Sequence, residues 1–563
     1  MLLIESSLVL VAIVFAFTFP TAGSHWFEVS ERGFVRLARR RGLAIVVVGL
    51  TALVLRAALL PILPVPEPVV HDEFGYLLAA DTFAHGRLTN PTHPMWVHFE
   101  TFSILQKPTY QCFAQPAQGL ILAAGKVIGG HPFWGVWFSA GLMCSAICWM
   151  LQGWLPPRWA LLGGLLAVLR LSTFSYWANS YWGGALGAIG GALVLGALPR
   201  IKRSQRVRDA LLMGLGLAIL ANSRPYEGFV FSLPFALALF AWMLGKHRPP
   251  IQVSLRRVVL PLSLLMALTA AGMGYYFWRV TGNPVRMPYQ VERETYAAAP
   301  FFRWQSPTSQ PIYHHKVMQR MYVDEELVGS ALARSPAGMI AKGVLAWTFY
   351  LGPVLTFPLL MMLIILPYGF SWKQVTGRTR FLLLTCAISL VGLGLETLFF
   401  TPHYAAPLAG LIFVFVLQAM RRLQLWRWRV ERTGLFMTRA IPVICVIMFL
   451  LRAAAVPLHI PLTESYAPAW YQRGPESFGR AAILADLQRI PGRQLVIVRY
   501  KPGHEPFEEW VYNDARIDDA KVVWSREMSS PENEELIRYF KDRNASVVEA
   551  DEKPPRLLPY QPQ

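Results

Sequence analysis

The sequence predicts an all-α polytopic membrane protein with about 11–12 transmembrane helices and a small C-terminal α/β domain. Of its 563 residues, 54% are hydrophobic and only 15% are charged, whereas soluble proteins carry about a quarter charged residues. The charged residues form short clusters between long apolar runs, which is the pattern of membrane proteins. The final segment, 458–563, is polar and lacks such runs, so we expect it to fold outside the membrane.

The net charge of +19 does not indicate a nucleic-acid-binding protein, because the basic residues are not gathered in one domain. They lie in alternate connections between apolar runs, where the positive-inside rule places them. The five cysteines have neither the spacing of a disulfide framework nor that of a zinc site. We also find no internal repeat and no glycine motif of the nucleotide-binding kind.

The first 42 residues predict an N-terminal membrane helix and a basic amphipathic segment. The apolar run 8–20 has no basic segment before it and no convincing cleavage site, so we interpret it as a retained helix rather than a signal peptide. The amphipathic stretch 24–41 ends in a cluster of arginines that should be cytoplasmic. The high ratio of Arg to Lys indicates a bacterial protein.

If the remaining apolar runs cross the membrane in alternating directions, every strongly basic connection lies on the same side. Between residues 65 and 113 five acidic residues stand against two basic ones, so this stretch should lie outside. We predict that the protein lies in the inner membrane of a bacterium, with its active site on the periplasmic side. The predicted spans are 43–63, 131–151, 159–172, 185–198, 210–221, 229–244, 258–280, 344–367, 381–400, 408–420 and 441–457.

This topology divides the chain into five parts. Residues 1–42 precede a transmembrane module, 43–280, which contains the first extracytoplasmic loop, 64–130. An extracytoplasmic loop follows at 281–342, then further helices at 343–457 and the soluble domain 458–563. Short helices are predicted at 74–83 and 118–128. In the soluble domain the patterns predict helices at 476–488 and 534–543 and strands at 494–500, 520–524 and 546–549.

The adjacent acids Asp72 and Glu73 open the loop 64–130. A carboxylate at the boundary between membrane and water can act as general base toward a hydroxyl or amine. The apolar helix that follows can lie on the membrane surface and aim both acids inward. The competing interpretation is two solvated loop acids, which spacing alone does not exclude.

Cationic and aromatic groups from three further segments are expected at the same level as the acids. Arg224, followed by Glu227, lies in a turn between two spans, and His403 with Tyr404 lies in another. An arginine at such a position suits a phosphate, although an arginine that only anchors the helix at the membrane interface is an equal alternative. Lys107 and Tyr110 close the loop 64–130 and can join them.

No motif in the sequence indicates metal binding. A divalent metal held by His93, His98 and Asp72 is conceivable, but no spacing is diagnostic and surface histidines are the simpler interpretation. Charges within spans are costly. Arg56 should therefore have a buried partner, with Glu396 as a candidate.

The order of these motifs resembles the GT-C superfamily of membrane glycosyltransferases, in particular the protein O-mannosyltransferase and lipid A aminoarabinose transferase group. The resemblance covers residues 43–457, and one departure is that the turn 174–183 lacks the second acid of many members. Four short motifs carry the resemblance: His71-Asp72-Glu73-Phe74, Gln-Pro-Ala-Gln-Gly at 115–119, the aromatic turn 174–183, and His403-Tyr404 near Pro407.

The resemblance implies an inverting transferase that moves a sugar from a polyprenyl-phosphate donor to an extracytoplasmic lipid, glycan or protein. Membrane lipids are then further partners and nucleic acid is not. Asp72 would be the base, with Glu73 supporting it or taking its role, while Arg224, Lys107 and His403 would hold the phosphate. The expected substrate-binding residues are His71, Tyr76, Lys107, Tyr110, Asn179, Tyr181, Trp182, Arg224, Glu227, His403 and Tyr404.

The alternative function is a transporter or flippase of a lipid-linked or polar substrate. Such a protein needs polar or broken helices at the bilayer midplane, and often repeated halves. Here the polar residues gather at the outer surface and no repeat is found. A non-catalytic assembly or sensor protein is a third interpretation, and it should tolerate loss of Asp72.

Overall fold

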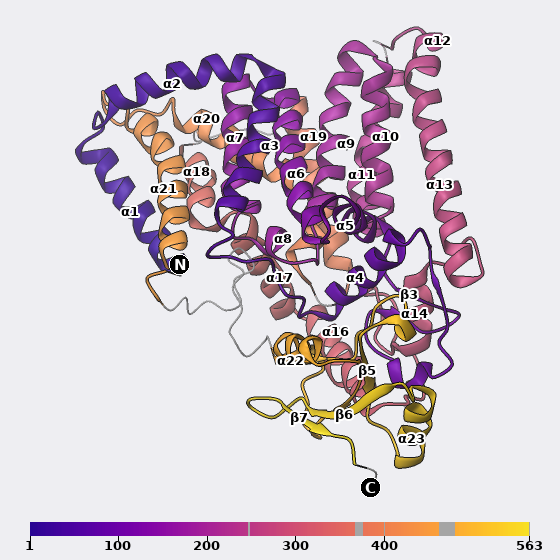
Figure 1. Cartoon of the computed structure of the whole chain (residues 1–563). Helices are drawn as coiled ribbons and strands as arrows, with labels where there is room; N and C mark the ends of the chain where they lie inside the picture. Colours follow the sequence, from indigo (N-terminus) through magenta and orange to yellow (C-terminus); the bar gives the residue numbers. More distant parts are fainter. Residues whose placement is uncertain (246–247, 366–374, 399, 456, 461–478, 562–563) are drawn as a thin grey trace.

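The computed structural model describes residues 1–245, 248–365, 375–398, 400–455, 457–460 and 479–561. A bundle of long helices forms one part of the molecule, and a small α/β domain lies beyond one end of it (Figure 1). The predicted fold class, a helical membrane protein with a C-terminal α/β domain, is confirmed.

Eight helical segments among the described residues are long and apolar enough to cross a membrane, and a bent pair can add a ninth. Three shorter helices, α1, α7 and α10, accompany them. The N-terminal run 8–20 and the eleven other predicted spans therefore each overlap helix in their described residues. The helices of the bundle are α1 (Leu2–Thr18), α2 (Ser24–Arg39), α3 (Arg41–Ala58), α6 (Phe133–Trp154), α7 (Pro157–Leu171), α9 (Ala185–Ser204), α10 (Val207–Ala221), α11 (Pro225–Leu244), α12 (Ile251–Ser254), α13 (Leu260–Thr281), α17 (Pro336–Tyr350), α18 (Gly352–Ile365), α19 (Gly377–Leu395), α20 (Ala409–Leu423) and α21 (Thr433–Ala455).

The span predicted at 344–367 is interrupted by a bend that the sequence did not predict. Two helices, α17 and α18, cover its described part and meet at an angle of 101°. Gly352 at the break has φ +57°, a conformation that glycine adopts at little cost. The buried pair of Glu5 and Arg170 lies against this position, and the Glu5 carboxylate accepts a hydrogen bond from Val354 N (3.0 Å). The bend thus places the free N–H groups of α18 on a buried acid.

Small residues bring the central helices together. A Cβ atom at Gly190 of α9 would lie 3.0 Å from the carbonyl oxygen of Gly216 in α10. At Gly191 the corresponding atom would lie only 2.2 Å from the carbonyl oxygen of Pro407. Close backbone contact through glycine is a common way to pack helices in a membrane. Helix α9 is consequently buried along most of its length and forms the centre of the bundle.

One end of the bundle carries the loops 64–130 and 281–342, and α12, which is followed by Arg256 and Arg257, lies at the opposite end (Figure 1). We refer to the first of these as the loop end. Two of its strands pair with β3 on either side, in the order β1-β3-β2. The elements of the loop end are α4 (His71–Ala84), α5 (Pro116–Gly129), α8 (Tyr176–Asn179), α14 (Pro288–Tyr296), α15 (Lys316–Gln319), α16 (Glu326–Arg334), β1 (Asn90–Pro91), β2 (Ile104–Leu105) and β3 (Thr109–Cys112).

The C-terminal domain has a four-stranded sheet in the order β5-β4-β6-β7, with β4 parallel to β5 and β6 and β7 antiparallel to β6. The three predicted strands and both predicted helices are present, although residues 476–478 lie outside the described residues. Strand β7 was not predicted. The elements are α22 (Gly479–Arg489), β4 (Arg493–Arg499), β5 (Val522–Arg526), α23 (Ser530–Tyr539), β6 (Arg543–Glu549) and β7 (Arg556–Pro559).

Candidate active site

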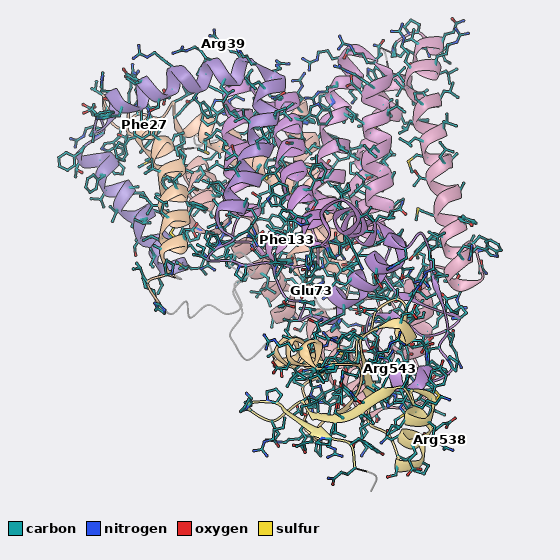
Figure 2. All side chains as sticks on the ribbon, viewed as in Figure 1. Phe27, Arg39, Glu73, Phe133, Arg538 and Arg543 are labelled. Atoms are coloured by element: carbon teal, nitrogen blue, oxygen red, sulfur yellow. The ribbon has the colours of Figure 1, made fainter. Side chains whose placement is uncertain are left out.

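The two acids of the loop 64–130 occupy the first turn of α4, where carboxylates stabilise a helix. Glu73 Oε2 accepts hydrogen bonds from Val69 N and Val70 N, both at 3.0 Å, and so caps the helix. Its other oxygen, Oε1, accepts a hydrogen bond from Tyr181 N at 2.9 Å. The Glu73 side chain is fully buried, and its carboxylate joins α4 to the turn 174–183. Figure 2 labels Glu73 between the helical bundle and the C-terminal domain.

Asp72 differs from Glu73 because its side chain remains 21% exposed. Its Oδ1 accepts a hydrogen bond from Ser103 Oγ (2.7 Å) and lies 3.2 Å from His71 Nδ1. Its Oδ2 accepts a hydrogen bond from Trp182 Nε1 (2.8 Å). The carboxylate is therefore fixed in orientation by three neighbours and still accessible.

These neighbours also determine the charge of Asp72. Burial alone would raise the pKa of the carboxyl, but the hydrogen bonds and charge of His71 oppose it, with further hydrogen bonds from Ser103 and Trp182. The net effect holds the pKa of Asp72 well below its usual range. Asp72 is thus ionised at every physiological pH.

Aromatic side chains connect Asp72 with η5 (Pro402–Leu408), the 3₁₀ helix that precedes α20. The Trp182 ring that donates to Asp72 lies 4.9 Å from the ring of His403. His403 in turn has its Nδ1 3.0 Å from the Tyr176 hydroxyl and its ring stacked on Tyr404 at 5.1 Å. His403 is buried, so it supports the aromatic wall of the site and presents no free cation.

Arg224 supplies the positive charge of this region. It lies at the start of α11, with its guanidinium 4.7 Å from the centre of the Tyr404 ring and 3.9 Å from Glu227 Oε1. Its charge acts on Tyr76 and Asp72 as well as on these two residues. Arg224 thus lies within electrostatic range of Tyr76, Glu227, Tyr404 and Asp72. That these residues form one binding site stays a prediction.

The loop 281–342 adds a charged cluster that the sequence analysis missed. In α14, Glu292 accepts a hydrogen bond from the Tyr322 hydroxyl (2.5 Å), and Arg293 pairs with Glu326. Burial raises the pKa of Glu292 to about 7, and the charge of Asp72 contributes to the rise. No local motif marks this cluster, since its members lie in a polar loop and come within electrostatic range of Asp72 only after folding.

Other predicted residues lie elsewhere. Lys107 is exposed and covers the ring of Trp96 at 4.0 Å, at the edge of a separate cleft of about 100 Å³. The Tyr110 hydroxyl donates to Asn513 O (3.1 Å) in the C-terminal domain. Asn179 donates to two carbonyl groups of its own turn. The structure gives these three no contact with Asp72 or Arg224.

Two pairings considered from the sequence are not formed. His93 lies 3.0 Å from Asp518 and His98 faces the carbonyl oxygen of Arg526, so neither reaches Asp72. Within the described ranges, no group of three or more potential ligands is placed to hold a metal ion. Arg56 donates to the carbonyl groups of Leu63, Pro64 and Ala178 rather than to Glu396. Main-chain oxygens thus satisfy this buried charge.

No protein-family model and no curated protein matches the chain. Among solved structures, the chain is similar to ArnT from Cupriavidus metallidurans in the apo state, at 12% identity and a TM-score of 0.49, covering 92% of this chain and 93% of that one. ArnT bound to undecaprenyl phosphate gives 12% identity and a TM-score of 0.45 over 90% and 92% of the two chains.

A second similarity is to the Archaeoglobus fulgidus oligosaccharyltransferase in the apo form, at 12% identity and a TM-score of 0.46. It covers 82% of this chain but only 62% of that one, so the chain spans less than two thirds of that protein. At such identities and TM-scores the similarities assign no activity. The functional conclusion rests on the geometry of the site.

Proposed function

We propose that this chain is a membrane glycosyltransferase of the GT-C superfamily, which transfers a sugar from a polyprenyl-phosphate donor to an extracytoplasmic acceptor. The observation that carries the proposal is the carboxylate of Asp72. It is ionised, oriented by Ser103 and Trp182, partly accessible, and within the field of Arg224. A general base and a phosphate-binding cation are the two groups that this reaction requires.

In the proposed reaction, an acceptor hydroxyl or amine attacks the anomeric carbon from the side opposite the phosphate. The sugar–phosphate bond breaks, and both of its electrons leave with the polyprenyl phosphate. Asp72 accepts the proton of the acceptor as the new bond forms, when that proton becomes acidic. Its low pKa makes it a weak base but guarantees that it is ready, while Arg224 neutralises the departing phosphate.

Glu73 has a supporting role in this proposal. Both of its oxygens are occupied by main-chain N–H groups and its side chain is fully buried. It fixes the start of α4 against Tyr181 and thereby positions Asp72. The side chains of Trp182, Tyr76 and Tyr404 form the surroundings in which the sugar binds.

We place the site on the extracytoplasmic face of a bacterial inner membrane. Support comes from the distribution of charge, since the basic connections lie at the end of the bundle opposite the loop end. An enzyme that uses a polyprenyl-phosphate sugar there has its donor lipid in the adjacent leaflet and its acceptor in the periplasm or on the membrane surface.

Two variants test the proposal by separating chemistry from donor binding. Asn keeps the shape of Asp72 but cannot take up the proton, so Asp72→Asn should lower transfer by about a hundredfold or more. Transfer is measured in membranes supplied with a panel of undecaprenyl-phosphate sugars, by mass spectrometry of the glycosylated products. Binding of undecaprenyl phosphate to purified Asp72→Asn should be unchanged.

Arg224→Ala should instead weaken the binding of undecaprenyl phosphate, while the protein stays well folded. Arg224→Lys should restore part of the binding, because the charge remains while the planar fork is lost. Wild-type transfer by Asp72→Asn would refute the proposed mechanism. Transport of the lipid-linked sugar without any transfer would favour the flippase instead.

A further inference from the structure

The C-terminal domain packs directly on α4, the helix that begins with the two acids. The ring of Tyr512 is stacked on the ring of Phe74 with centroids 4.0 Å apart and planes parallel to within 1°. The guanidinium of Arg480 lies 4.8 Å from the centre of the same Phe74 ring. Phe74 is two residues from Asp72, so the domain contacts the helix within its first turn.

The same domain also holds the other end of α4. Asp81 accepts a hydrogen bond from Ala515 N (2.9 Å) through Oδ2, while its Oδ1 pairs with Lys126 of α5 (2.5 Å). Phe74 and Asp81 lie seven residues apart, about two turns of helix. Contacts at both positions restrain the tilt and the rotation of α4 together, which one contact cannot do.

A third contact is made with His71, the residue beside Asp72. The ring of Phe507, in the short 3₁₀ helix Pro506–Glu508, stacks on the ring of His71 with centroids 5.8 Å apart and planes 26° from parallel. His71 is the neighbour whose Nδ1 lies 3.2 Å from Asp72 Oδ1. Phe507 is 37% exposed, so it lies at the rim of the site rather than in the core of its own domain.

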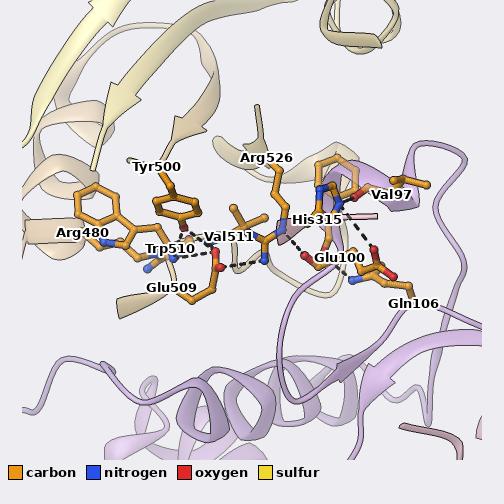
Figure 3. A network of polar contacts seen from close by, with 11 residues as sticks. Val97, Glu100, Gln106, His315, Arg480, Tyr500, Glu509, Trp510, Val511 and Arg526 are labelled. Atoms are coloured by element: carbon orange, nitrogen blue, oxygen red, sulfur yellow. Dashed lines mark hydrogen bonds and ion pairs between the residues drawn. The ribbon is translucent and has the colours of Figure 1, made fainter. Parts of the chain in front are cut away.

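The interface between the C-terminal domain and the loop 64–130 also contains buried polar contacts (Figure 3). Arg526 pairs with Glu509 at 2.8 Å, with both side chains buried, and donates through Nε to the carbonyl oxygen of Glu100 (2.6 Å). Glu509 also accepts hydrogen bonds from Tyr500 and from two main-chain N–H groups. Separating the domain from the loop 64–130 would expose this network to competing water and leave Glu100 O without its donor.

We infer that the C-terminal domain is a positioning module of the active site, which holds α4 and the His71 ring so that the Asp72 carboxylate keeps its orientation. The inference rests on the proposed function for its consequences in catalysis. Tyr512 and Phe507 are the positioning residues, the first acting through Phe74 and the second through His71.

Hydrogen exchange of the full-length protein in detergent tests the mechanical part, independently of any reaction. Tyr512→Ala removes the ring that stacks on Phe74, so exchange of the α4 amides should rise about 3- to 10-fold. Tyr512→Phe keeps the ring and should restore wild-type exchange. Tyr560→Ala, in the same domain but just after β7, is the matched aromatic control and should change nothing in α4.

Turnover tests the catalytic part. Phe507→Ala, at an exposed position, should leave thermal stability unchanged and lower kcat several-fold while the KM for the undecaprenyl-phosphate sugar stays the same. Phe507→Tyr should recover kcat. This pair also decides the question if Tyr512→Ala fails to fold.

Two results would overturn the inference. One is unchanged exchange of α4 in a folded Tyr512→Ala protein, and the other is wild-type kcat in Phe507→Ala. If no sugar transfer is found for the wild-type protein, the proposed function fails, but the exchange experiment still decides whether the domain holds α4.

Discussion

At the scale of single residues, the two adjacent acids at 72 and 73 have received different environments. The Glu73 carboxylate satisfies three main-chain N–H groups and is fully buried, whereas Asp72 meets side-chain donors and stays partly open. A main-chain donor cannot move away without unfolding the turn, whereas the side-chain donors Ser103 and Trp182 orient Asp72 and leave part of its carboxylate exposed. The difference in donors supports the proposal that Asp72, and not Glu73, is the base.

The low pKa of Asp72 makes a prediction about pH. In the proposed mechanism Asp72 acts as the base when it is ionised, so the acid limb of kcat/KM should lie well below pH 4 in the wild type. Ser103→Ala removes one stabilising hydrogen bond, so the pKa of Asp72 should rise and the limb should move to higher pH. His71, Trp182, Arg224 and Glu292 are the other groups that act on Asp72, and they are left intact. An acid limb that stays in place in Ser103→Ala would show that the hydrogen bond does not control the pKa.

Glu292 leads to a prediction about how the stability of the folded protein depends on pH. Its pKa is raised from 4.5 to about 7, so the folded protein binds the proton more tightly than the unfolded chain does. Stability from this group is therefore present below about pH 4.5 and is lost as pH rises to about 7. Glu292→Gln resembles the protonated form, so it should raise the melting temperature at pH 8 and leave it nearly unchanged at pH 4.5. Equal shifts at both pH values would exclude a protonated Glu292.

Some of this site could be predicted from the sequence and some could not. The start of the loop 64–130 identified Asp72, because acids after an apolar run at the outer boundary are conspicuous. Its donors Ser103 and Trp182 lie 31 and 110 residues further along the chain, and no periodicity connects them with position 72. Glu292 was missed for the same reason, and Lys107 was included although it lies over Trp96 instead.

At the scale of elements, apolar length predicted the helices well and their breaks poorly. The run 344–367 reads as one span because leucine, phenylalanine and isoleucine continue through it. The bend at Gly352 depends on Glu5 and Arg170, which come from two distant helices. A local pattern cannot contain that information.

The close contact of α9 with η5 yields a prediction about packing. In Gly191→Ala the new methyl group would meet the carbonyl oxygen of Pro407 at 2.2 Å, and main chain cannot yield as a flexible side chain would. We expect a loss of about 1–3 kcal/mol in stability, measured by thermal unfolding in detergent. Gly272→Ala in α13 is the control, since its methyl group would meet nothing within 4 Å. A Gly191→Ala protein as stable as this control would disprove the tight contact.

At the scale of the whole molecule, we predict that the loop end of the bundle faces the outside and the opposite end faces the cytoplasm. In a protein without its native cysteines, single cysteines at His85 and Gly503 should react with a membrane-impermeant maleimide added to intact cells. A cysteine at Arg427 should react only after the cells are opened. All three positions are exposed, so access to the compartment decides the result. Labelling of the His85 position from the cytoplasm alone would invert the arrangement.

The division of the chain into a bundle and a polar domain could be predicted from composition, because burial in lipid and exposure to water select different residues. The attachment of that domain to α4 could not be predicted from the sequence. Its contacts, such as Tyr512 on Phe74, join residues more than four hundred positions apart. A surface that is buried in the folded protein looks like any polar or aromatic loop in the linear sequence.

The contrast between α9 and α13 has a consequence for how this protein can change over time. Residues of α9 are fitted against neighbouring backbone, as at Gly190 and Gly191, so almost any replacement there collides. Helix α13 turns leucines such as Leu264 and Leu268 outward, and its buried residues are confined to the end at 276–281. Lipid chains adapt to any apolar shape, so Leu, Ile, Val and Phe are interchangeable on that face. We therefore expect the sequences of relatives to drift freely along α13 while α9 keeps its glycines, and an alignment of them should show the two rates side by side.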